Sequence, residues 1–167
     1  MQAYLDRLSD KPAMDFINKV GDLFKTLPAL PKGLVEFLVK IAPYLALLSA
    51  VVTIVFGPLF GLLGTLASIL SVSPVYMIWV ILTLVVMIAE AILWILAYKP
   101  LQARAMQGWI YMFWASALSA VDGALGILNG DLGSLIGALI GLAISFYILF
   151  QMRPFYGKVA AAVEKMS

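Results

Sequence analysis

The chain has 167 residues, of which 63% are hydrophobic and 12% are charged, and its formal net charge is +2. A typical soluble domain has about a quarter charged residues, so this composition excludes an ordinary water-soluble fold and indicates one helical domain in a lipid bilayer. Cysteine and histidine are both absent, which excludes disulfides, thiolate nucleophiles and the usual zinc, iron–sulfur and histidine-ligated haem sites. We therefore expect no cofactor and no metal.

Residues 1–33 are predicted to form an amphipathic region in front of the membrane domain. Asp10-Lys11-Pro12 has the form of a helix start, with an Asp cap and a Pro in the first turn. The apolar residues that follow recur at helical spacing, and they are Phe16, Ile17, Val20, Leu23, Phe24 and Leu27. We expect this helix to lie in the headgroup plane of a membrane. The alternative is that it docks on the cytosolic ends of the bundle or on a partner.

Residues 34–152 are predicted to cross the membrane four times. The first apolar run, residues 41–70, is too long for one upright span, and Pro58 in its middle removes a helical hydrogen bond. We expect a kinked or broken first span over about residues 41–60. A half-helix would then run to about residue 71, at the outer surface or dipping back into the membrane. Gly57 and Gly61 give this part a close-packing face.

The other three spans are predicted over residues 75–98, 109–128 and 132–152. Aromatic residues bound the first of these, as they do at membrane interfaces, and they are Tyr76, Trp79, Trp94 and Tyr98. Lys99-Pro100 is expected to end that span, because proline cannot continue a helical hydrogen-bond ladder. Arg153-Pro154 stops the last span in the same way, and residues 153–167 form a polar tail.

The basic residues indicate an orientation. All 11 Lys and Arg residues fall before the first span, between the second and third spans, or after the fourth. Cytosolic loops carry an excess of Lys and Arg, so this distribution predicts four spans with both termini in the cytosol. The expected location is a plasma or inner membrane, with the lipid bilayer as one partner.

Two acids, Glu90 and Asp122, fall inside the predicted spans. An ionisable group there costs roughly 2.5–3.5 kcal/mol on insertion scales and is a functional hypothesis by default. The two acids could be stations of a proton or cation path, with Thr83 as a relay for Glu90 and Ser119 as a relay for Asp122. Alternatively, each is protonated or hydrogen-bonded and holds the helices in register. From the helical rise we place them about 9 Å apart along the membrane normal.

Small residues line one side of each of the last two predicted spans, where another helix backbone can come close. In the third span they are Ala115, Ser119, Gly123 and Gly126, and in the fourth they are Gly133, Gly137, Gly141 and Ser145. The two faces could pack on each other within one chain. They could equally form a contact between copies, and the sequence does not choose between these alternatives.

No enzyme motif is found in the sequence. A serine intramembrane protease needs a general base, normally His, and an aspartyl one needs a Gly-x-Gly-Asp signature, whose first Gly is missing from residues 128–131. There is no phosphate-binding Gly-rich loop and no basic cluster suited to nucleic acid. We expect a non-enzymatic structural, assembly or accessory subunit that self-associates or joins a larger membrane complex. The alternative is an oligomeric small transporter or channel with a cation or proton route through Glu90 and Asp122.

Overall fold

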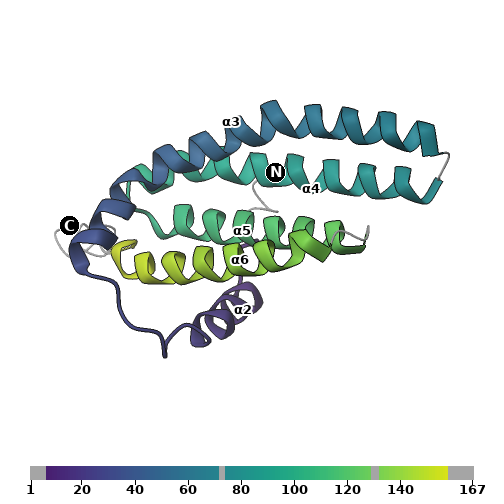
Figure 1. The fold of residues 1–167 in the computed structure, drawn as a ribbon. Helices are drawn as coiled ribbons and strands as arrows, with labels where there is room; N and C mark the ends of the chain where they lie inside the picture. Colours follow the sequence, from purple (N-terminus) through teal and green to yellow (C-terminus); the bar gives the residue numbers. More distant parts are fainter. Residues whose placement is uncertain (1–6, 72–73, 129–131, 158–167) are drawn as a thin grey trace.

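The structure is a computed structural model that describes residues 7–71, 74–128 and 132–157. Within these ranges, side chains are described except at positions 58, 60–65, 67–71, 74–77, 79, 122–128 and 132–138. The described chain is all-helical and has no strand, as the sequence predicts. Its elements are α2 (Lys11–Asp22), α3 (Lys32–Ser71), α4 (Pro74–Gln102), α5 (Met106–Leu128), α6 (Leu132–Met152) and the 3-10 turn η1 (Arg153–Phe155) (Figure 1).

Helices α3 to α6 run up and down as a bundle in which each helix packs on the next one along the chain (Figure 1). The contacts of α4 with α3 and with α5 are the most extensive, whereas α3 meets α6 over a small area. At 1.5 Å per residue, α3 is about 60 Å long and α6 about 32 Å. The α3–α4 pair therefore projects beyond the α5–α6 pair.

Helix α3 is one uninterrupted α-helix of 40 residues, so the predicted half-helix leading to residue 71 is wrong. Figure 1 shows that α3 changes direction about halfway along its length, as the predicted kink requires. A proline inside a helix removes one hydrogen bond and bends the helix without having to end it. Packing against α4 keeps the helix continuous here, because Gly57 lies buried against Met87 of that helix.

Helix α4 also continues past a proline. It was expected to end at Lys99-Pro100, but it runs on to Gln102 with Pro100 inside its last turn. Backbone hydrogen bonds carry the chain past this point, from the Ala103 N–H to the Lys99 carbonyl (3.1 Å) and from the Ala105 N–H to the Pro100 carbonyl (2.9 Å). Near a helix end only one intrahelical bond is lost to proline, so the last turn persists.

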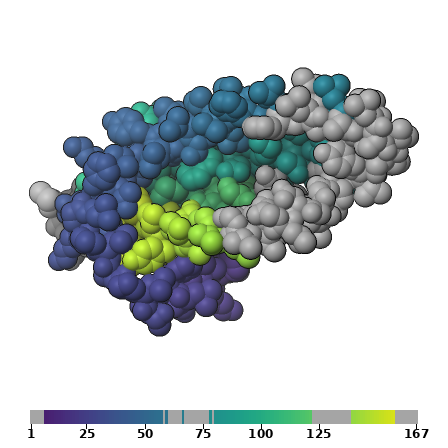
Figure 2. Space-filling model, viewed as in Figure 1, coloured from purple at the N-terminus to yellow at the C-terminus, as the bar shows by residue number. Residues whose placement is uncertain are grey.

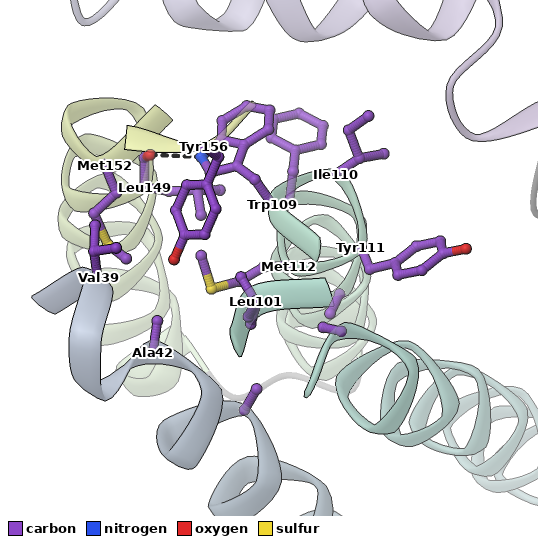
Figure 3. Close-up of a cluster of buried hydrophobic side chains, with 14 of the residues drawn as sticks. Val39, Ala42, Leu101, Trp109, Ile110, Tyr111, Met112, Leu149, Met152 and Tyr156 are labelled. Atoms are coloured by element: carbon purple, nitrogen blue, oxygen red, sulfur yellow. Dashed lines mark hydrogen bonds between the residues drawn. The ribbon is translucent and has the colours of Figure 1, made fainter. Parts of the chain in front are cut away.

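The core lies at the end of the bundle where α3 and α5 begin and α4 and α6 end (Figure 3). Trp109 is fully buried there, and its indole Nε1 donates a hydrogen bond of 2.8 Å to the Leu149 carbonyl. Its ring stacks on Phe113, with ring centroids 5.9 Å apart, and meets Phe150 edge-on at 5.5 Å. Aromatic pairs in these geometries stabilise by about 0.5–1.5 kcal/mol each beyond the burial of their area.

Helix α2 begins where the sequence predicts, although the Asp10 side chain makes no capping hydrogen bond. Its apolar face lies against α5 and α6. Ile17 is fully buried, and the Phe16 ring stacks on Trp114 with centroids 5.9 Å apart. The Trp114 indole also donates a hydrogen bond of 3.0 Å to the Leu8 carbonyl. The described contacts thus pack α2 against the sides of α5 and α6.

Two helical stretches are long and apolar enough to cross a membrane, Lys32–Gly57 and Val80–Gln102, with mean hydropathies of 2.1 and 2.7. In their most apolar parts only 28% and 17% of the residues are buried, whereas the core helix of a soluble protein would be mostly buried. The described apolar stretch Leu139–Phe155, which covers the second half of α6 and η1, is shorter. Figure 2 shows one face of the molecule, on which α3 lies above α6 and α2.

Candidate functional site

The most distinctive polar feature inside the bundle is the carboxylate of Glu90, on α4. One of its oxygens, Oε1, accepts a hydrogen bond of 3.0 Å from the indole Nε1 of Trp94, one turn along the same helix. The same oxygen accepts a hydrogen bond of 2.5 Å from the Ser119 hydroxyl on α5. Glu90 and Trp94 are half-buried, and Ser119 is exposed. The Ser119 bond therefore joins two neighbouring helices through one acid.

Hydrogen bonds, rather than a cation, stabilise this acid. The described partners of its carboxylate, Trp94 and Ser119, are uncharged hydrogen-bond donors. Hydrogen bonds to an ionised carboxylate are shorter and roughly twice as strong as those between neutral groups. A polar bond between two apolar helices also sets their register. The arrangement can thus act as a clamp between α4 and α5, or hold a proton at Glu90.

The hydrogen-bond partners at this site differ from those that the sequence predicts. Ser119 was expected to serve Asp122, but its hydroxyl bonds to Glu90. Thr83 is half-buried on α4, and the described donors to Glu90 are Trp94 and Ser119. The Asp122 backbone lies one turn beyond Ser119 in α5, and its side chain lies outside those described.

Glu90 lies further from the end of its helix than the sequence predicts. Ser119 bonds to Glu90, and Asp122 follows Ser119 by three residues, a rise of about 4.5 Å. The predicted axial distance between the two acids was about 9 Å because Glu90 was counted from an assumed helix end at Tyr98. Since α4 runs on to Gln102, Glu90 lies about 18 Å from the end of its helix.

The predicted small-residue faces are described only in part. Gly57 is buried on α3, and a Cβ placed there would overlap the Cε of Met87 on α4. Gly141 and Ser145 on α6 are exposed, and nothing lies within 4 Å of a Cβ placed at Gly141. On α5, Ala115 is fully buried and Ser119 contacts α4. The other predicted positions lie outside the described side chains, and they are Gly61, Gly123, Gly126, Gly133 and Gly137.

An alanine series on α3 makes a close contact that the sequence analysis missed. Ala42, Ala46 and Ala50 recur every fourth residue and are at most 3% exposed. Ala91 and Ala97 on α4 are buried as well. Small side chains let two helix backbones approach closely. Three alanines at intervals of four are visible in the sequence, and they favour a close helix contact as glycines at the same spacing do.

A cleft of about 380 Å³ opens between α3 and α6, where these two helices separate. Its lining is mostly apolar and includes three serines, Ser49, Ser116 and Ser145. Trp94 forms part of the wall, and the same indole donates to Glu90. The Trp94 side chain therefore lines the cleft and also forms a hydrogen bond with the Glu90 carboxylate.

Tyr156 places an unpaired hydroxyl in the core. The side chain is 2% exposed, its ring points into the core (Figure 3), and its hydroxyl has no hydrogen-bond partner among the described residues. Burial raises the pKa of Tyr156 from 10.0 to about 12, although the charge of Arg104 opposes the rise. Because the fold favours the neutral phenol, its contribution to stability is complete below pH 10 and is lost as the pH rises toward 12.

We expect Tyr156→Phe to raise the free energy of unfolding by about 1 kcal/mol, because it removes a buried hydroxyl that has no hydrogen-bond partner among the described residues. The variant should also lose less stability between pH 10 and pH 12 than the parent protein, since it has no phenol to ionise at this position. Thermal unfolding of both proteins across this pH range measures the difference. If both proteins lose the same stability between pH 10 and pH 12, the loss does not come from ionisation of Tyr156, and the prediction is contradicted.

No protein-family model, curated protein or solved structure matches this chain. Among the described residues, no group of three or more His, Cys, Asp or Glu side chains could hold a metal ion.

Proposed function

We propose that this protein is an integral membrane protein that crosses the bilayer four times, with both termini on the cytosolic side. In this proposal it acts as a structural, assembly or accessory subunit and catalyses no reaction. The observation that carries the proposal is the outer face of α4. This face is a stripe of large aliphatic side chains, each 46% to 60% exposed: Ile78, Ile81, Val85, Ile88, Ile92 and Ile95.

The residues of this stripe are spaced as on one face of a helix, but their side chains are apolar and therefore unsuited to contact with water. A helix on the surface of a soluble protein turns polar residues outward and apolar residues inward. On α4 the outward residues are isoleucine and valine, while smaller residues such as Ala91 and Ala97 are buried. Leu48, Val51 and Val55 on α3 are large aliphatic side chains that are exposed as well. Lipid is the solvent that favours such an arrangement.

The charges support one orientation for the bundle. The described basic residues of α3 to η1 all lie at the end of the bundle that contains the core (Figure 1), and they are Lys32, Lys40, Lys99, Arg104 and Arg153. The opposite end has no Lys or Arg in its sequence. An excess of basic residues marks the cytosolic side. This agrees with the alternation of four spans, because each helix reverses the direction of the one before.

The open face of α6 supports a role in assembly. Gly141 and Ser145 are exposed on that helix, and no described atom lies within 4 Å of a Cβ placed at Gly141, so the described part of the chain leaves this face open. A helix from a second copy, or from another membrane protein, could approach closely there.

Gly141→Leu tests this role. The open space at Gly141 allows the larger side chain without disturbing the fold, so we expect smaller particles in native mass spectrometry of gently solubilised protein. Ala143→Leu is the matched control, because Ala143 is exposed on a different side of the same helix. A particle mass that is the same in Gly141→Leu and the parent protein would remove α6 as the assembly surface.

One observation favours a second candidate function, an oligomeric proton or cation channel. The Glu90 carboxylate and the Ser119 hydroxyl are in direct contact, and Asp122 follows one turn further along α5. Hydroxyl and carboxyl groups joined in this way can pass a proton between them.

Glu90→Gln distinguishes the two functions, because the amide keeps a hydrogen-bond acceptor for Ser119 but cannot exchange a proton at neutral pH. If the clamp is the role of Glu90, we expect an intact fold and no change in proton flux through proteoliposomes. Loss of a flux that the parent protein shows would instead favour the channel. Ser119→Ala should loosen the α4–α5 contact by about 1 kcal/mol in the first case.

A further inference from the structure

A second cavity, of about 400 Å³, lies between α2 with its following turn and the end of α6. In Figure 1, α2 lies directly beneath α6 here. One part of the lining is polar, with Asn18, Lys25, Gln151 and Arg153. Another part is apolar, with Phe24, Leu27 and Phe150. A cavity with both characters suits a ligand that has a polar head and an apolar body.

Arg153 is held in place at this cavity. One of its guanidinium nitrogens, Nη2, donates a hydrogen bond of 2.8 Å to the Asn18 side-chain oxygen, and its Cζ lies 5.1 Å from the centre of the Trp109 ring. No carboxylate among the described residues forms an ion pair with it. A guanidinium has five N–H donors, so within the described part of the chain most of them can still bind an anion.

Lys25 is the second basic group at the cavity. It forms an ion pair of 2.6 Å with Asp22, and both side chains are more than half exposed. Exposed pairs of this kind contribute little and are readily exchanged for another partner. With Arg153, Lys25 and Asp22 counted together, the cavity lining carries an excess of one positive charge.

We propose that this cavity binds the phosphodiester headgroup of an anionic membrane lipid, with Arg153 as the principal contact and Lys25 as the second. Arginine binds phosphate through two parallel N–H bonds, and pre-positioning by Asn18 and Trp109 lowers the entropy cost of that contact. Phe24 and Leu27 lie where the glycerol and upper acyl carbons would follow. The inference rests on the proposed membrane location, which puts this end of the bundle at the cytosolic leaflet, where anionic lipids gather.

The experiment uses the full chain in nanodiscs of equal parts phosphatidylglycerol and phosphatidylcholine, with retained lipids counted by native mass spectrometry. We expect the parent protein to retain phosphatidylglycerol preferentially. Arg153→Gln should reduce that retention about tenfold and Lys25→Gln by a smaller factor. Lys99→Gln is the control, because Lys99 is exposed at the same end of the bundle but does not line the cavity.

If Lys99→Gln and Arg153→Gln reduce the retention of phosphatidylglycerol equally, the proposal is overturned, because equal reductions indicate diffuse electrostatic attraction to the bilayer. Displacement of the lipid by millimolar inorganic phosphate would also overturn it in favour of a soluble anion. Circular dichroism in pure phosphatidylcholine reports whether Arg153→Gln is folded, and Lys25→Gln serves as the test if it is not. A protein that does not enter nanodiscs contradicts the membrane proposal itself, whereas an inserted protein without headgroup preference contradicts only this inference.

Discussion

Gly108→Ala is expected to destabilise the protein by about 3 kcal/mol or more, the largest effect of any single methyl group that the structure allows us to assess. Gly108 lies buried at the start of α5, under the last turn of α4. A Cβ there would be 2.6 Å from the Leu101 nitrogen and 2.9 Å from the Pro100 carbonyl carbon. Both are backbone atoms, so the methyl group is accommodated only if α4 and α5 separate.

Two other glycines provide the comparison. At Gly57 the added Cβ would meet only the tip of the Met87 side chain, which can rotate away, so Gly57→Ala should cost far less. At Gly33 nothing lies within 4 Å, and Gly33→Ala in the first turn of α3 should stabilise by about 0.5–1 kcal/mol. Unfolding by SDS, followed by circular dichroism, ranks the three variants. A Gly108→Ala protein as stable as Gly57→Ala would contradict the described α4–α5 turn.

Trp109→Ala is expected to cost about 3–5 kcal/mol, because it removes the largest fully buried side chain of the core. The indole contacts two aromatic rings, of Phe113 and Phe150, and its ring lies under the Arg153 guanidinium. Its N–H also bonds to the Leu149 carbonyl, which links the start of α5 to the end of α6. The substitution therefore weakens packing, a hydrogen bond and the placement of Arg153 together.

Trp109→Phe separates these contributions. Phenylalanine retains most of the ring contact but leaves the Leu149 carbonyl without its indole donor, at a cost of about 1–2 kcal/mol. Trp114→Phe is the matched control, because Trp114 is half-buried and donates to the Leu8 carbonyl outside the bundle. The same SDS titration measures all three variants. A smaller loss for Trp109→Ala than for Trp114→Phe would show that the core is not centred on Trp109.

The bounds of a helix could be predicted from the sequence where the residues next to its ends determine them. The bounds of α6, Leu132–Met152, are those predicted, because Arg153-Pro154 follows an unbroken apolar run. The start of α2 at Lys11 was also predicted. The kink in α3 was predicted, but the continuation of α3 to Ser71 and of α4 to Gln102 was not, since whether a proline bends or ends a helix depends on neighbouring helices that the sequence does not reveal.

The candidate site was predictable in its residues but not in its pairing. Glu90 stands out because it is an acid in an apolar run, and Ser119 was named as a relay. Which acid Ser119 meets depends on how α5 is rotated against α4, and this rotation is set by packing of small residues such as Ala115. The Trp94 donor could have been found, because it follows Glu90 by four residues on one helix.

The central claim, that the outer face of α4 is in contact with lipid, is tested most directly by spin labels. The chain has no cysteine, so Ile88→Cys and Gln102→Cys can each be labelled uniquely in protein reconstituted into liposomes. Power-saturation electron paramagnetic resonance then compares collisions with oxygen, which concentrates in lipid, and with a water-soluble nickel chelate. We predict that the label at Ile88 encounters oxygen and is protected from nickel, and that the label at Gln102, at the charged end, encounters nickel. A label at Ile88 that nickel reaches as readily as one at Gln102 would contradict the membrane assignment.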